Sequence, residues 1–475
     1  MPDVINPFAP LPKSRVLFNV KTCKSQIEDI LDKVATTFDP SARYHSPLTT
    51  TGSCAGAALK SAIELLKDDC GKVLWFFMDI PSVGYGSLRN RNNRSLYGTE
   101  KEKTLLVPEE KTKAYIDLAS IGVKERVGVD VFACTQSDVD LASIAPVVAL
   151  TGGEVYYYSP YNSTEYGEKL HFDLFRNLTR QTVYDVSIKA RCSLGLSIHK
   201  YYGSFGETLE TPIQLSTMDS DKTIAFTIKQ TSKLSSDSQA HVQFAILYTS
   251  GNMQRKVRIF NYTFAVTNMV SHVYSSVDMD ALIGLEARIH MLTIQKQSLS
   301  NARNELCDIC IRTLAHYRKT VSTSSASGQF VLPESMKTYP ILLLSLMKIP
   351  AYGLMENTKL DAKVASLIQL SELSFSYLLM RLYPKMYSIA QIIDPEQLYG
   401  TMIINAVDNT ESISVYKPMN IPSSADKMVP TDAYLIANSD FIYLYLPKDV
   451  SESILMEVFG KSSLSELVPE EDYQC

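Results

Sequence analysis

The chain has 475 residues and a mass of 53.0 kDa, a length that predicts about three or four domains. Hydrophobic residues make up 45% and charged residues 20%, which favours several buried cores over disorder. The net charge of −5 and the pI near 5.9 argue against nucleic acid as the main ligand. Eight cysteines are too few for a disulfide framework, which favours a cytoplasmic protein.

From the sequence we expect neither a targeting segment nor a membrane-spanning segment. No run approaches the roughly 20 apolar residues that cross a bilayer. The first residues, MPDVINPFAPLPKSR, lack a basic-then-apolar leader, so we expect no secretory signal.

Residues 1–180 have the pattern of an α/β domain. Helix-like runs at 25–35 and after Gly52 precede VLWFFMDI (73–80), an apolar run suited to a strand buried on both faces of a parallel sheet. A second strand is predicted at 127–134, a helix over 138–150 and a third strand at 154–159. This strand–helix–strand order predicts a doubly wound sheet.

Residues 181–275 change to short strands separated by Gly, Ser and Asp. Five strands are predicted, at 184–191, 196–202, 223–230, 241–248 and 255–266. Their number and spacing indicate a β-sandwich or a barrel. Gln181–Phe260 contains nine basic and six acidic residues, so this region carries a positive charge.

The rest of the chain divides into a helical and a mixed region. Over 276–380, apolar residues recur every three or four positions from Leu299 to Tyr317, which predicts an amphipathic helix. Further helices are expected at 340–347 and 360–371. Over 381–475, strands are expected at 401–408 and 441–447, and a helix at 451–459; from Gly400 onward there are four basic and twelve acidic residues.

Three local patterns suggest chemistry, and each has a plainer explanation. GSCAG around Cys54 imitates a nucleophile elbow, but the residues before it are polar, so a small-residue helix start is favoured. Asp79 and Ser82 follow a strand and suggest a metal-dependent adhesion site, yet Pro81 occupies the first serine position of that motif. Cys307 and Cys310 form a single C-x-x-C, whereas structural zinc needs four ligands.

No nucleotide-binding, metalloprotease or triad motif appears, which favours a binding or scaffold protein over an enzyme. Among the remaining candidates, Lys189 and Arg191 are two residues apart, so on a strand they share one face. They form either a solvated sheet face or a site for carboxylates, which arginine binds with two parallel hydrogen bonds.

Five long segments resemble the cargo-adaptor subunit of the COPII vesicle coat, the Sec24 family. The segments are PSVGYGSLRNR (81–91), VDVFACTQSDVDLASIAPVVALTGGEVYYY (129–158), ARCSLGLSIHKYYGSF (190–205), FAILYTSGNMQRKVRI (244–259) and VLPESMKTYPILLLSLMK (331–348). The resemblance runs from about Asn6 to about Leu467. It implies a multi-domain α+β protein with a partial α/β trunk of von Willebrand A-like type (1–180), a β-sandwich (181–275), an all-helical domain (276–380) and a gelsolin-like domain (381–475).

The resemblance also implies a function without catalysis and without a cofactor. Such a protein pairs through its trunk with a sister inner-coat subunit and acts on the anionic surface of the endoplasmic reticulum, where it meets a small GTPase and, indirectly, the outer cage. It selects SNAREs and membrane cargo with acidic Asp-x-Glu-type export signals for transport to the Golgi. The implied cargo-signal residues are Lys189, Arg191 and the apolar Ile246; Lys189 departs from the usual arginine and so loses the planar fork.

Two parts of the family pattern have no counterpart in this sequence. They are the amino-terminal region, with its zinc ribbon and first trunk strands, and the helix that closes the gelsolin-like domain. We therefore expect no structural zinc site and an incomplete signal pocket. The alternative left open is a metal-dependent adhesion domain on the α/β segment.

Overall fold

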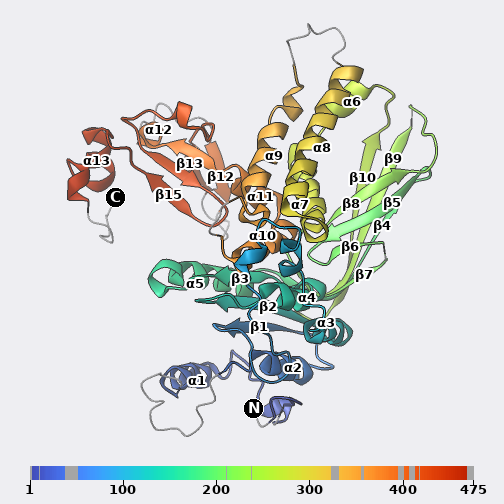
Figure 1. Ribbon diagram of the computed structural model, residues 1–475, viewed down its shortest axis with the longest axis vertical. Helices are drawn as coiled ribbons and strands as arrows, with labels where there is room; N and C mark the ends of the chain where they lie inside the picture. Colours follow the sequence, from blue (N-terminus) through green and yellow to red (C-terminus); the bar gives the residue numbers. More distant parts are fainter. Residues whose placement is uncertain are drawn as a thin grey trace. The chain divides into compact units, whose positions relative to one another are not determined.

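The computed structural model describes residues 3–9, 11–37, 52–209, 211–236, 238–321, 331–354, 358–393, 401–405, 412–416 and 418–467. The chain divides into two compact units (Figure 1). The first unit contains Met1–Tyr339 and Met347–Leu373, and the second contains Pro340–Leu346 and Ser374–Cys475.

The first region of unit 1 is a parallel sheet with helices packed on it. Its strands are β1 (Gly71–Phe77), β2 (Val127–Cys134) and β3 (Val155–Tyr158), in the order β1-β2-β3 and all parallel. The helices are α1 (Lys24–Thr37), α2 (Ala55–Leu65), α3 (Ala114–Glu125), α4 (Leu141–Thr151) and α5 (Ser163–Thr179). The parallel sheet is therefore confirmed, but its three described strands contain no reversal of order, so a doubly wound topology is not seen in them.

The middle strand and the edge strand of this sheet differ in burial. Every residue of β2 is buried, whereas Phe76 of β1 and Met78 just after it are 48% and 54% exposed. The expectation that this segment is covered on both faces is therefore wrong: Trp75 and Phe77 are buried on one face of β1, whereas Phe76 on the other face is exposed. One face carries a stack of aromatic rings, with centroids of Phe76 and Phe132 4.6 Å apart and those of Phe132 and Tyr156 4.5 Å apart.

The predicted helix stop at Thr151-Gly152-Gly153 has a packing reason. Gly152 ends α4 with φ of +85°, a conformation that favours glycine. A Cβ at Gly153 would lie 1.9 Å from the carbonyl oxygen of Val129. The backbone can therefore approach β2 this closely only because residue 153 is a glycine. Glu154 and β3 follow directly after it.

The second region of unit 1 is a β-sandwich. One sheet has the order β10-β9-β4-β7 and the other the order β6-β5-β8. The bounds are β4 (Thr182–Cys192), β5 (Leu196–Gly203), β6 (Gly206–Thr208), β7 (Ile213–Asp219), β8 (Ala225–Gln230), β9 (Gln239–Thr249) and β10 (Arg255–Ala265). All five predicted strands are present within a few residues; β6 and β7 were not predicted.

The third region is helical. It contains α6 (Val270–Ser275), α7 (Met279–Lys296), α8 (Leu299–Thr320), α9 (Tyr339–Lys348), α10 (Leu360–Glu372) and α11 (Phe375–Leu382). The apolar stripe predicted from Leu299 to Tyr317 is the buried face of α8. The division into compact units does not follow this helical region: α11 and most of α9 belong to unit 2, and the other helices belong to unit 1.

Unit 2 also contains two small sheets. Strands β11 (Lys385–Ser388), β14 (Tyr434–Ala437) and β15 (Ile442–Tyr445) form one antiparallel sheet, and β12 (Thr401–Asn405) pairs with β13 (Ser412–Tyr416). Helices α12 (Ile389–Ile393) and α13 (Glu452–Phe459) complete the unit. The predicted strand over 401–408 is thus present to Asn405, and 406–408 lie outside the described residues.

Across the described ranges, no helix combines the length and the apolar composition needed to cross a membrane.

Candidate functional site

The two predicted basic residues lie on one exposed face of the β-sandwich. Strand β4 alternates strictly near its end: Ile188 and Ala190 are buried in the core, and Lys189 and Arg191 point to the opposite side and are exposed. We call this surface of the β10-β9-β4-β7 sheet the outer face. An antiparallel sheet commonly packs one face on a core and leaves the other in water.

Ile246, the third predicted site residue, does not lie on the outer face. In the β4–β9 register it is opposite Ile188, and it packs against the sandwich core together with Phe244. The neighbouring Leu247 is opposite Ser187 and therefore points to the same side as Lys189. The structure brings Lys189 and Arg191 together on one face, and on that face it places Leu247, rather than Ile246, diagonally next to Lys189.

Two cations of the outer face, Lys189 and Arg191, have no acidic partner among the residues that the structure describes. Within the described ranges, neither Lys189 nor Arg191 forms an ion pair or a side-chain hydrogen bond. Arg255, on the same face at the far end of β10, is different, because its guanidinium lies 2.9 Å from Asp185. The two free cations can therefore attract an anion from outside the chain.

Ile246 instead lines a cavity of about 420 Å³ on the inner side of the same sheet. Its walls are mainly apolar, with Phe260 and Tyr262 from β10 and Phe226 from β8, and Arg258 is the exposed cation at this cavity. The cavity lies on the core side of the sheet, so it is separate from Lys189 and Arg191.

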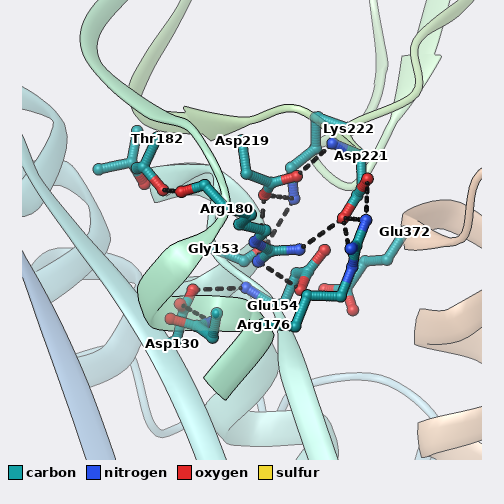
Figure 2. A network of polar contacts seen from close by, with 12 residues as sticks. Asp130, Gly153, Glu154, Arg176, Arg180, Thr182, Asp219, Asp221, Lys222 and Glu372 are labelled. Carbon is teal, nitrogen blue, oxygen red and sulfur yellow. Dashed lines mark hydrogen bonds and ion pairs between the residues drawn. The ribbon is translucent and has the colours of Figure 1, made fainter. Parts of the chain in front are cut away.

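The second concentration of charge in unit 1 is buried (Figure 2). It consists of five residues, and we call it the ionic junction: Glu154 before β3, Arg180 after α5, Asp219 at the end of β7, Lys222 after β7, and Glu372 at the end of α10. Arg180 lies 2.6 Å from Glu154 and 3.3 Å from Asp219, and its side chain is 5% exposed. Lys222 donates to the carbonyl oxygen of Gly153 at 2.9 Å and lies 3.8 Å from Asp219.

Burial and the neighbouring cations have opposite effects on the pKa values of the carboxyl groups in the ionic junction. Burial alone would raise the pKa of Glu154, but Lys222 and Arg180 hold it at about 2. Burial also raises the pKa of Glu372 well above its ordinary value, and here the opposing effect of Lys222 is not sufficient. One oxygen of Glu372 accepts from the backbone N–H of Val155 at 3.3 Å.

Helix α10 makes two further polar contacts with the α/β region. The Asp361 carboxylate accepts from the backbone N–H groups of Val139 and Leu141, at 2.5 and 2.9 Å, where α4 begins. Lys363 pairs with Glu102 at 2.7 Å, and both side chains are 3% exposed. These contacts and the ionic junction fix α10 at three points against the α/β region: the start of α4, Glu102 and the start of β3.

The other chemical candidates are not assembled into sites. Cys54 precedes α2 and is a free thiol, and no hydrogen bond described in the structure joins it to a histidine. Cys307 and Cys310 are likewise free, and Cys307 contacts the sulfur of Met347 at 3.7 Å. Among the described residues there is no group of three or more His, Cys, Asp or Glu side chains that could hold a metal ion. The absence of a cofactor stays a prediction.

Sequence reasoning missed the ionic junction, and it did not anticipate that Ile246 lies on the core side of the sheet. Arg180, Asp219 and Lys222 lie at strand and helix ends, where charged residues are ordinarily solvated, so no local pattern marks them. The face of Ile246 was accessible from the sequence, because period-two alternation groups it with Val242, Phe244 and Tyr248, which are all core residues.

Comparison with known proteins gives three domain matches in chain order. The sequence matches the Sec23/Sec24 trunk domain over residues 1–178, the Sec23/Sec24 beta-sandwich domain over 183–267 and the Sec23/Sec24 helical domain over 278–380. These matches define a coat protein of the Sec23/Sec24 type.

Individual relatives place the chain within this group. It is 30% identical to the Arabidopsis thaliana protein transport protein SEC24 B over 98% of this chain and 40% of that protein. It is 28% identical to human Sec24B over 98% of this chain and 35% of that protein. The crystal structure of the human COPII-coat protein Sec24c superposes with a TM-score of 0.81 at 26% identity, covering 95% of this chain and 57% of that one.

The chain belongs to the Sec24 family. The predicted combination of trunk, β-sandwich and helical domains is thereby confirmed. The gelsolin-like assignment of 381–475 and the three boundaries between the four predicted domains stay predictions. The chain spans about 40% of the length of the curated relatives it matches.

Proposed function

We propose that this chain is a cargo-adaptor component of the COPII coat that binds export signals and catalyses no reaction. Family membership supports the coat role. The observation that carries the adaptor role is the pair of exposed cations, Lys189 and Arg191, on the rigid outer face with no acidic partner described in the chain. Their ligands would be acidic signals on the tails of membrane cargo and SNAREs travelling from the endoplasmic reticulum to the Golgi.

The spacing of the two cations fits an Asp-x-Glu signal. Residues two apart on a strand are separated by about 6.7 Å, and alternate side chains of an extended tail have the same spacing. Arg191 would bind one carboxylate with two parallel hydrogen bonds, and Lys189 would act on the other as a compact charge. Leu247 would contact an apolar side chain of the tail, the role that the family resemblance suggested for Ile246.

A peptide titration tests the site. We expect Arg191→Ala to weaken binding of a fluorescent Asp-x-Glu tail by more than about 1 kcal/mol, as the loss of a charge-assisted hydrogen bond does. Arg255→Ala is the matched control, because this arginine shares the outer face but is already paired with Asp185. Equal affinities of the wild-type and Arg191→Ala chains would remove Arg191 from the site.

The proposal extends to partners and location. The trunk would pair with the sister inner-coat subunit at the anionic, cytoplasmic surface of the endoplasmic reticulum, with a small GTPase and the outer cage acting indirectly. A pull-down from cytosol tests this part. The sister subunit should be recovered in near-equal amount, and recovery without it would contradict a coat role.

The metal-dependent adhesion alternative receives no structural support, since the described part of the chain offers no cluster of three ligands. Calorimetric titration with Mg²⁺ separates the two hypotheses, because an adaptor requires no specific Mg²⁺ site.

A further inference from the structure

The outer face continues beyond Arg191. Although β4 ends at Cys192, its pairing with β9 goes on: the Ser193 N–H donates to the carbonyl oxygen of His241 at 2.9 Å, and the His241 N–H donates to the Ser193 hydroxyl oxygen at 3.0 Å. Ser193 and His241 therefore follow Arg191 by one two-residue step on the same face. Lys189, Arg191 and the Ser193–His241 pair form a line with a regular spacing of about 6.7 Å.

A depression of about 350 Å³ lies at this end of the line. Its lining includes Arg191, Ser193, His241, Gln243, Asn261 and Thr263. None of the described residues that line it is acidic. A cation and neutral polar groups without a carboxylate are the surroundings that an anion requires.

The hydrogen bonds within the depression leave donors available. The Gln243 side-chain nitrogen donates to the side-chain oxygen of Asn261 at 3.1 Å, so the Asn261 amide nitrogen is the group left to donate. His241 Nδ1 and the Thr263 hydroxyl are 3.0 Å apart, which leaves Nε2 as the second polar atom of the ring. The site therefore presents the Asn261 amide nitrogen of β10 as a donor, and His241 Nε2 of β9 as a second polar atom, in the depression that Arg191 also lines.

We infer that His241, with Ser193 and Asn261, forms a second anion subsite that takes a third carboxylate of the same tail. This inference rests on the proposed function. In an extended tail the side chains at i, i+2 and i+4 point to one side, so carboxylates at these positions would face Lys189, Arg191 and His241 in turn. The preferred signal is thus an alternating acidic run of three, Asp-x-Glu-x-Glu, rather than Asp-x-Glu alone.

Three labelled tail peptides test the inference against the full chain by fluorescence anisotropy. The first carries Asp-x-Glu, the second carries Asp-x-Glu-x-Glu, and the third has the same charge as the second but its last Glu at i+3. We expect the second peptide to bind about fivefold more tightly than the first, a gain typical of one exposed ionic contact. The third should gain less than about twofold, because its last carboxylate points away from His241.

Variants of His241 test whether the higher affinity of the second peptide depends on this residue. His241→Ala should remove the advantage of the second peptide and leave binding of the first unchanged, and His241→Arg should retain it. Gln239→Ala is the matched control, since this residue is exposed on the same face of β9 one step further from Arg191. Near-ultraviolet circular dichroism of each variant establishes that the sandwich is intact.

The outcomes separate this inference from the proposed function. If the first peptide does not bind the wild-type chain, the proposed signal site fails and the subsite fails with it. If the first peptide binds in an Arg191-dependent manner, but the second and third have equal affinities, or His241→Ala keeps the gain, only the subsite is overturned.

Discussion

The outer face and the ionic junction are both rich in charge, but they differ in whether the charge is compensated. In the junction, Arg180 and Lys222 each contact a carboxylate or a carbonyl of the chain and are nearly inaccessible. On the outer face, Lys189 and Arg191 are exposed without a described partner. Compensated, buried charge fixes how regions of unit 1 pack, whereas uncompensated, exposed charge is available to a ligand. Substitutions in the two regions should therefore separate stability from binding.

The largest effect is expected for Arg180→Ala. The change leaves the buried carboxylates of Glu154 and Asp219 without their closest cation, and breaking such a buried pair destabilises by about 3–5 kcal/mol. Arg176→Ala is the control, because the Arg176–Asp221 pair is more exposed and should contribute at most about 1 kcal/mol. Urea unfolding at pH 7 measures both. Similar midpoints for the two variants would show that the junction adds no stability.

Lys363→Met should come next, at about 3 kcal/mol, because it leaves the Glu102 carboxylate buried and unpaired. Replacing both partners, as Lys363→Met with Glu102→Leu, should restore much of the loss, since the uncompensated charge is gone. A double variant no more stable than Lys363→Met would indicate that the pair matters through its shape rather than through its charge.

The pH dependence of stability should reflect Asp361. Burial raises the pKa of Asp361 to about 7, against the effect of its two backbone donors. Between the ordinary value of 3.8 and this value, the unfolded chain holds fewer protons than the folded one, so the free energy of unfolding falls as pH rises from about 4 to 7. The loss is at most about 4 kcal/mol. Asp361→Asn should flatten this part of the stability profile, and an unchanged slope would assign it to other groups.

Features that depend on neighbouring residues could be predicted from the sequence, and features that depend on contacts between distant residues could not. The alternation of β4 and the apolar stripe of α8 are local, so strand and helix positions, and the shared face of Lys189 and Arg191, were predictable. The ionic junction joins residues from Glu154 to Glu372, and its pairs depend on tertiary packing that local periodicity does not encode. Strand β7 was missed for a related reason, because its Ser216 and Thr217 are buried polar residues that interrupt the apolar pattern.

The smallest and most discriminating effect concerns the adjacent residues Ile246 and Leu247. Because Ile246 packs on the sandwich core, Ile246→Ala should lower the free energy of unfolding by about 2 kcal/mol and leave tail affinity unchanged. Leu247→Ala should do the reverse, with little loss of stability and a two- to threefold weaker binding of a tail that carries an apolar residue beside its acidic pair, an estimate of about 0.5 kcal/mol for a partly exposed contact. Thermal unfolding and anisotropy titration of both variants measure the two quantities. If Ile246→Ala weakens tail binding in a chain that remains folded, the tail contacts the inner side of the sheet, and the cavity beside Arg258 becomes the place to look for it.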